Sequence, residues 1–384
     1  MAVHIPPLLV VLLAATTAPL LREATARFGL PLVVFELLLG VAIGPHGLGW
    51  ASSTAAVPYF ALLGLAFLFF LAGMEIDLAD IREELKIAVP AWLITLAIAC
   101  GIALLLRSLG LIHAWGVVAI AIATTALGVL VPVIRDGGML GTTFGRHVLA
   151  AGTVGELGPI LAMSLALSTR HTVPLQSAFT IAFVIGTLLL GWLMLQARTP
   201  RVIQLLSRTI HQSSQLPIRL VVFLIVALAL LADVLGLDIA LGALVAGMLT
   251  GLAVRDMEGQ VLHLKMDAVG FGFLVPIFFI NSGMKLEVGA LFDNAAGPLL
   301  AAAIIAAILL ARLPFVVLAA RSLGSRDATA LGLCSATTLS LIVALTEVAV
   351  KHGFMTPAEA APLIGAGVLT VVRFPTIAFR LAKT

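Results

Sequence analysis

The chain has 384 residues, of which 61% are hydrophobic and 11% charged, and it carries a formal net charge of +3. Soluble domains are usually about 45–50% apolar and roughly 25% charged, so this composition excludes a soluble globular protein. The basic residues form no stripe interleaved with aromatic residues, so no nucleic-acid partner is expected. The sequence predicts an all-α polytopic protein whose surroundings are the lipid bilayer.

The membrane-spanning helices can be counted from the apolar segments, because a helix needs about 20 apolar residues to cross the hydrocarbon. With glycine, proline and charged residues taken as breaks, the sequence predicts thirteen such helices. Their approximate limits are 5–21, 31–46, 57–76, 87–107, 113–134, 144–168, 173–197, 216–233, 238–254, 266–284, 296–320, 327–350 and 357–380. The first lacks a preceding basic region, so we expect it to be retained rather than removed as a signal peptide.

The lysines and arginines orient these helices, since cytoplasmic loops are enriched in both. With the N-terminus outside, the outer loops contain four basic residues, namely Arg107, Arg170, Lys285 and Lys351. Arg312 and Arg373 lie within spans, and the remaining basic residues lie on the cytoplasmic side. This predicts a multi-pass protein of the inner (plasma) membrane with the N-terminus outside and the C-terminus cytoplasmic.

The two halves of the chain resemble each other in three ordered pairs of segments. The pairs are 64–78 with 272–288, 121–139 with 333–355, and 149–159 with 364–375. An Ala-Thr-Thr triplet occurs in both members of the second pair. The alternative is chance similarity between apolar segments.

Six helices per copy and one linker helix would place the second copy upside down in the membrane. We therefore expect residues 1–172 to form a first inverted repeat, 173–215 a linker helix with a cytoplasmic loop, and 216–384 a second inverted repeat. Inverted repeats are typical of secondary transporters, whose ion sites lie near the bilayer midplane between the repeats.

Glu156 is a lone carboxylate in an apolar helix, ten residues after Arg146. At 1.5 Å per helical residue, it lies about 15 Å from the cytoplasmic edge. Thr125, Thr337 and Arg312 lie at similar depths from their nearest cytoplasmic arginines. Four polar features from four helices therefore predict a buried site at mid-depth, with Glu156 as its ion-binding carboxylate or, alternatively, as half of a structural ion pair.

The two Ala-Thr-Thr triplets are expected break points in their helices. The hydroxyls of Thr124, Thr125, Thr337 and Thr338 can bind backbone groups that unwinding leaves unsatisfied in hydrocarbon. The sequence thus predicts two crossed, interrupted helices whose ends point at a bound cation. Ordinary packing between helices is the alternative for these threonines.

Several residues compete for roles at this site. Arg312 is expected either as a structural counter-ion or as an active participant in the transport cycle. Arg373, close to the mirror position of Glu156 in the second repeat, is a rival charge partner. Glu36, at comparable depth, is a rival carboxylate.

Three stretches resemble the monovalent cation:proton antiporter-2 family of the sodium/hydrogen exchanger superfamily. They are LPLVVFELLLGVAIGPHGLG, LGLAFLFFLAGMEIDL and LGALVAGMLTG. The resemblance implies a homodimer in which a transport bundle moves against a fixed dimerisation domain, the two being interleaved between the repeats. It also implies elevator-type alternating access.

Two positions depart from the pattern of the family that the chain resembles. The family's ion-binding helix carries Asp-Asp, Asn-Asp or Gln-Asp where this chain has Gly155-Glu156, so the first side chain is missing. Arg312 matches a position at which many members carry a basic residue, often lysine. These departures leave the choice between Na⁺ and K⁺ open.

Taken together, these features predict competition of one H⁺ and one monovalent cation, Na⁺ or K⁺, for Glu156. Arginine stays protonated, so one titrating carboxylate predicts 1:1 electroneutral antiport. No nucleophile–base pair, metal cluster or phosphate-binding loop is found, so neither an enzyme nor a cofactor is expected. Because the sequence stops at Thr384, ligand gating is expected to need a separate regulatory subunit.

The alternative function is a cation-coupled symporter of a small organic anion, which crossed-helix folds of this type also serve. That function predicts a larger polar cavity in which Asn281, Ser282 and Arg373 surround the anion. Under the antiporter hypothesis, Asn281 and Ser282 are expected to serve in packing, because they lie nearer the outer end of their helix.

Overall fold

A computed structural model describes most of the chain. The described residues are 6–25, 32–54, 56–75, 81–127, 129–130, 134, 137–139, 141–166, 182–183, 185–187, 189–190, 205, 208–235, 237, 239–253, 257–285 and 296–382. Every regular element in this part is a helix. Seven of its helices are long and apolar enough to cross a membrane, so the protein is a multi-pass membrane protein.

The helices mostly overlap the apolar segments that predict them. They are α1 (Pro7–Ala24), α2 (Leu32–Ile43), α3 (Val57–Glu75), α4 (Arg82–Ser108), α5 (Trp115–Ile122), α7 (Thr143–Ala166), α10 (Leu216–Val234), α11 (Ile239–Ala253), α12 (Met257–Val269), the π-helical η2 (Gly270–Leu274), α13 (Val275–Met284), α15 (Ala296–Ala311), α16 (Leu313–Ser335), α17 (Ser340–Lys351) and α18 (Pro357–Ala382). However, α12 begins before the expected span 266–284, and α15 and α16 divide at Arg312, inside the expected span 296–320. The expected seventh span, 173–197, lies mostly outside the described residues. The total of thirteen spans and the inverted repeat stay predictions.

The chain forms two compact units, each assembled from separated segments. One unit contains Met1–Pro58, Leu78–Met163 and Phe279–Thr384, and the other contains Tyr59–Asp77 and Ser164–Phe278. Each unit therefore draws on both halves of the sequence. The boundaries expected at residues 172 and 215 are those of the two inverted repeats. The division into compact units does not test them, because a repeat need not form a compact unit by itself.

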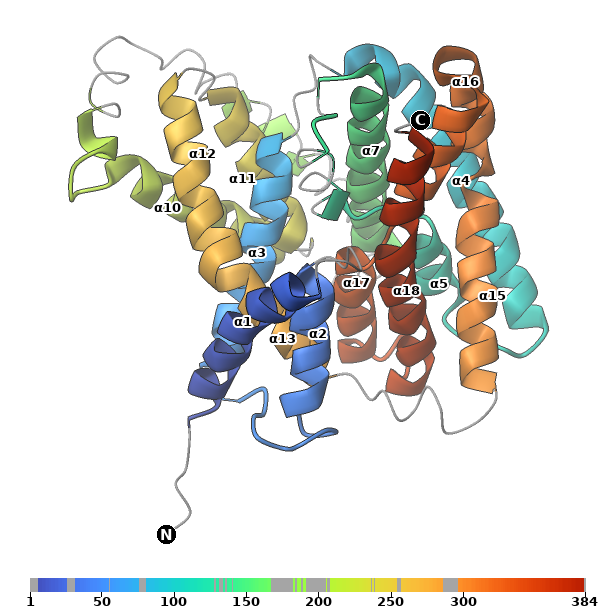
Figure 1. Cartoon of the computed structure of the whole chain (residues 1–384), viewed down its shortest axis with the longest axis horizontal. Helices are drawn as coiled ribbons and strands as arrows, with labels where there is room; N and C mark the ends of the chain where they lie inside the picture. The colour runs from blue at the N-terminus through green and yellow to red at the C-terminus, as the bar shows by residue number, and fades with distance from the viewer. Residues whose placement is uncertain are drawn as a thin grey trace. The chain divides into compact units, whose positions relative to one another are not determined.

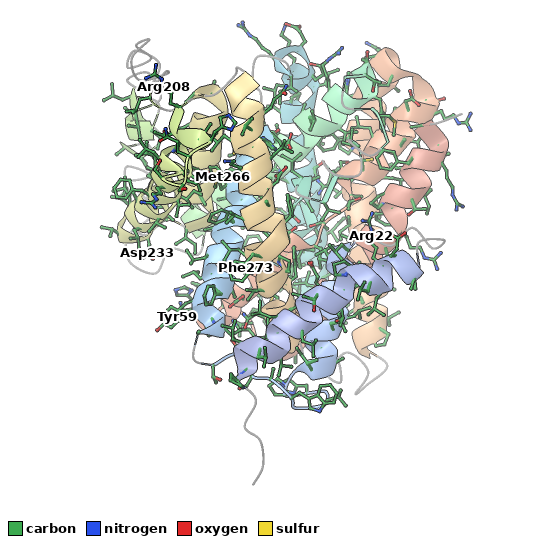
Figure 2. All side chains as sticks on the ribbon, turned by 60° about the vertical axis from the view of Figure 1, so that its left-hand side comes forward. Arg22, Tyr59, Arg208, Asp233, Met266 and Phe273 are labelled. Atoms are coloured by element: carbon green, nitrogen blue, oxygen red, sulfur yellow. The ribbon has the colours of Figure 1, made fainter. Side chains whose placement is uncertain are left out.

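The smaller unit contains α10, α11, α12 and most of α3. Helices α3 and α11 pack closely at Gly247. A Cβ added to this glycine would lie only 2.0 Å from the carbonyl oxygen of Phe70. Phe60 and Phe273 pack edge to face with their ring centroids 5.7 Å apart. Figure 2 shows Met266 on α12 and Phe273 farther along the same helical rod.

The larger unit contains the helices that carry the predicted site. In it, α18 packs against α15, α16 and α17, and α4 packs against α5, α15 and α16. Figure 1 shows α18 (red) between α17 and α15. A buried apolar cluster that includes Trp92, Val148 and Phe315 joins α4, α7 and α16, and thereby fixes the helices around Glu156.

Candidate functional site

Two helices of the larger unit are interrupted at their Ala-Thr-Thr segments. Helix α5 ends at Ile122, residues 124–126 are not helical, and helical structure resumes at Leu127. In the same way, α16 ends at Ser335, residues 337–339 are not helical, and α17 begins at Ser340. The interruptions expected at both triplets are therefore present.

The interrupted segments contact each other through backbone and hydroxyl groups. The amide of Ala126 donates to the carbonyl of Thr337 at 2.8 Å, and the hydroxyls of Thr124 and Thr338 share a hydrogen bond. The Thr125 hydroxyl donates to the carbonyl of Ser335 at 2.7 Å. Each segment thus satisfies backbone groups that its partner leaves open, as a dry environment requires.

A neighbouring helix binds each interrupted segment at an equivalent place. The amide of Thr125 donates to the carbonyl of Gly155 on α7 at 2.8 Å. The hydroxyl of Thr370 on α18 donates to the carbonyl of Thr338 at 2.9 Å and accepts from the Thr338 amide at 3.1 Å. Gly155 and Thr370 belong to the paired segments 149–159 and 364–375 of the sequence.

Glu156 lies on α7 beside the first interruption, and only 2% of its surface is exposed. The backbone amide of Leu127, where helix resumes, donates a hydrogen bond to its carboxylate. Among the described residues, its second oxygen, Oε2, has no hydrogen-bond partner, and neither has the hydroxyl of Thr153 one turn earlier. Buried oxygens of this kind are costly unless a donor or a cation occupies them.

These two oxygens are suited to a hard monovalent cation. Residues three apart on a helix lie on one face, so Thr153 and Glu156 present a hydroxyl and a carboxylate to the same side of α7. Oxygen ligands are the ones that hard cations prefer. The arrangement can hold either a proton on the carboxylate or a desolvated cation between the oxygens.

Arg312 also contacts the first interruption. It lies between α15 and α16 and is 1% exposed. Its Nη2 donates to the carbonyl of Ile122 at 3.2 Å and also to that of Thr124. Because carbonyls at a helix C-terminus carry partial negative charge, the guanidinium stabilises the end of α5.

The expected charge partners do not form a direct ion pair with Glu156. Within the described residues, no ion pair shorter than 4.0 Å joins Glu156 to Arg312 or to Arg373. The side chain of Arg373 is exposed on α18. In this structure Arg312 donates to the backbone beside Glu156 through Nη2, and its buried Nε and Nη1 have no hydrogen-bond partner among the described residues.

Three other predicted residues are buried away from these contacts. Glu36 lies on α2 and is 4% exposed. Asn281 and Ser282, near the end of α13, are also buried, and their Oδ1 and Oγ atoms lack hydrogen-bond partners among the described residues. No hydrogen bond in the described part of the chain joins these three side chains to Glu156 or to the crossing threonines.

Three further residues at the site were not predicted from the sequence. Thr153 offers the second open oxygen, Thr370 binds Thr338, and the indole of Trp92 donates to the carbonyl of Ala123 at 3.0 Å. Thr153 was detectable from its spacing, three residues before Glu156. Nothing in the sequence indicates that Trp92 reaches across to Ala123.

The chain is similar to a known protein family, to individual proteins and to a solved structure. The family model described as "Sodium/hydrogen exchanger, transmembrane" matches residues 11–384. The putative Na⁺/H⁺ antiporter YjbQ of Bacillus subtilis is 25% identical over 98% of this chain and 63% of its own length. The chain thus spans less than two thirds of that relative.

Two further proteins show similarity over most of their length. The Na⁺/H⁺ antiporter of Enterococcus hirae is 26% identical over 73% of each chain. The solved structure of the sodium proton antiporter MjNhaP1 from Methanocaldococcus jannaschii superposes with a TM-score of 0.72 over 97% of both chains at 18% identity. The two proteins therefore share a similar fold over nearly the whole chain.

Proposed function

Because the chain belongs to the sodium/hydrogen exchanger family, we propose that it is a secondary active antiporter exchanging Na⁺ or K⁺ for H⁺. One observation carries this proposal: Glu156 is buried beside two interrupted helices and has an unpartnered carboxylate oxygen. The Na⁺/H⁺ antiporters among its relatives support the same reaction.

The exchange follows from competition for one carboxylate. A proton on Glu156 removes the negative charge that a cation needs, and a bound cation excludes the proton. Thr153 supplies a neutral oxygen that helps to replace the hydration shell of the cation. Thr124, Thr125, Thr337 and Thr338 hold the unwound backbone, whose carbonyls are further cation ligands.

A single exchangeable group limits the stoichiometry. Arg312 stays protonated, because arginine does not release its proton in proteins. Each cycle then carries one cation in one direction and one proton in the other. Transport is therefore electroneutral at 1:1, and membrane potential neither drives nor opposes it.

The membrane architecture extends the proposal. Thirteen spans, with the N-terminus outside, would place Glu156 at mid-depth in the bilayer. The matching contacts of Gly155 with Thr125 and of Thr370 with Thr338 support inverted repeats. Alternating access by an elevator-type motion within a homodimer completes the scheme.

Proton flux in proteoliposomes tests this function. Addition of Na⁺, K⁺ or Li⁺ should dissipate an imposed pH gradient, and the most effective cation identifies the substrate. An imposed membrane potential should leave the initial rate unchanged. Proton flux that requires an added organic anion would instead indicate the symporter, and flux that follows the potential would contradict 1:1 exchange.

A further inference from the structure

A cavity of about 380 Å³ lies where α13, α17 and the start of α18 come together in the larger unit. Figure 1 shows the ends of α17 and α18 side by side there. Its polar lining comes from Ser282 and Lys285 at the end of α13 and from Thr346, Glu347 and Lys351 on α17. The cavity thus contains one carboxylate, two hydroxyls and two ammonium groups.

The cavity has features of a built cation site. Ser282 is 4% exposed, and its hydroxyl has no hydrogen-bond partner among the described residues. The Thr346 hydroxyl donates to the carbonyls of Ile342 and Val343, which leaves its oxygen free to accept. With the Glu347 carboxylate, these groups give the cavity three oxygen-bearing side chains of the kind that hard cations prefer, and the ammonium groups of Lys285 and Lys351 line the same cavity and oppose a free cation there.

The carboxylate of Glu347 is already paired with a positively charged side chain of the protein itself. The ammonium group of Lys285 forms an ion pair with Glu347, and both side chains are about two-fifths exposed. Exposed ion pairs contribute about 0–1 kcal/mol, so the pair can open. An incoming monovalent cation can therefore compete with the lysine for the same oxygens.

The cavity leads toward the crossing of the interrupted helices. Val343, Thr346, Glu347 and Val350 line it from one face of α17. That helix begins at Ser340, directly after the second interruption. Val343 follows Ser340 by three residues, which corresponds to about 4.5 Å along the helix.

We propose that this cavity is a second monovalent-cation site on the route to Glu156, with Lys285 as a tethered competitor bound to Glu347. The proposal rests on the antiporter function proposed above. A cation arriving from this side displaces the ammonium group, binds Glu347, Thr346 and Ser282, and then passes inward along α17. Lys285 thereby sets the cation concentration at which this side of the membrane begins to supply Glu156.

The test measures the apparent KM for the cation from each side of the membrane, in right-side-out and everted vesicles. Lys285→Gln should lower the KM on one side by about fivefold, the scale of one charge interaction near a surface, and leave the other side unchanged. Glu347→Gln should raise the KM on that same side. In the double variant, Lys285→Gln should have no further effect. Glu83→Gln, which breaks the exposed Lys86–Glu83 pair, is the matched control and should change neither side.

Three results would overturn the second site: a KM that rises in Lys285→Gln, a KM that changes equally on both sides of the membrane, or a KM that neither substitution changes. Glu156→Gln is measured in parallel. If that variant still transports, the antiporter mechanism itself fails, whatever the cavity variants do. If it is inactive while the cavity variants behave like the parent protein, the second site alone fails.

Discussion

Gly155 stands where the family that the chain resembles carries an amide or acidic side chain, and the structure supplies a physical reason. A Cβ added to Gly155 would lie 2.3 Å from the Thr125 hydroxyl and 2.6 Å from the Thr125 Cβ. Thr125 therefore occupies the space that the missing side chain would need. Its hydroxyl donates to the Ser335 carbonyl and so holds the crossing together.

Gly155→Ala should consequently damage both folding and transport. Crowding a packed core costs about 1–3 kcal/mol, and here it displaces the interrupted segment directly beside Glu156. We expect a lower unfolding temperature in detergent and a transport rate reduced at least several-fold. Gly101→Ala on α4 is the control, because a Cβ at that position meets no atom within 4 Å. Equal behaviour of the two variants would refute the account of Gly155.

Thr153 offers a way to separate ion binding from stability. Its buried hydroxyl has no hydrogen-bond partner in the described part of the chain, so Thr153→Val removes an unsatisfied group at nearly constant volume. Such a change is close to neutral for folding. The unfolding temperature should stay the same or rise, while the KM for the cation rises by about fivefold because one ligand worth about 1 kcal/mol is lost. A lower unfolding temperature with an unchanged KM would assign Thr153 to packing.

At the scale of elements, the close approach of α2 and α13 depends on paired glycines. A Cβ on Gly40 would lie 2.1 Å from the carbonyl oxygen of Ile280, and one on Gly283 would lie 2.2 Å from that of Leu37. In both cases the obstacle is backbone, which cannot move aside as a flexible side chain can. The contact fixes the helix that carries Asn281 and Ser282.

Gly283→Ala should therefore separate α2 from α13. We expect destabilisation of about 1–3 kcal/mol or more, measured as a lower unfolding temperature. The variant should also alter the cavity beside Ser282, so its transport should fall more than its stability alone explains. Unfolding at the temperature of the parent protein would show that the helices tolerate a wider spacing.

The helices themselves could be read from the sequence to a large extent. Apolar runs located the spans, and the Ala-Thr-Thr triplets located both interruptions, because threonine hydroxyls can bind free backbone groups. The π-helical turn at Gly270–Leu274 carried no comparable signal, whereas the kink at Gly324, with φ of 79°, falls in the break expected between the spans 296–320 and 327–350. A deviation such as the π-helical turn depends on neighbouring helices, and a single sequence does not reveal which helices those are.

At the scale of the whole molecule, the depth of each residue in the membrane was expected from its distance along the helix to the nearest cytoplasmic arginine. These depths placed four residues in one layer, namely Glu156, Thr125, Thr337 and Arg312, but they do not determine which of the four are in contact. Depth is one coordinate, whereas the contact of Arg312 with the carbonyls of Ile122 and Thr124 depends on the rotation and crossing of three helices. The same limit explains why Arg373 looked like a rival partner although its side chain is exposed.

Competition between H⁺ and cation predicts a simple pH dependence for the whole transporter. Acidification on the cation side protonates Glu156 and removes its charge, so the apparent KM for the cation should rise. The increase should approach about tenfold for each unit of pH, because one proton excludes one cation, while the maximal rate with saturating cation stays constant. A maximal rate that falls with an unchanged KM would indicate a separate regulatory proton.

The central claim is that one carboxylate alternately holds the proton and the cation. It is tested most directly by cation-driven dissipation of a pH gradient in proteoliposomes containing Glu156→Gln. Glu36→Gln, which neutralises the rival buried carboxylate on α2, is measured beside it. The account predicts that Glu156→Gln abolishes the exchange whereas Glu36→Gln retains it. Exchange that survives in Glu156→Gln but is lost in Glu36→Gln would contradict it.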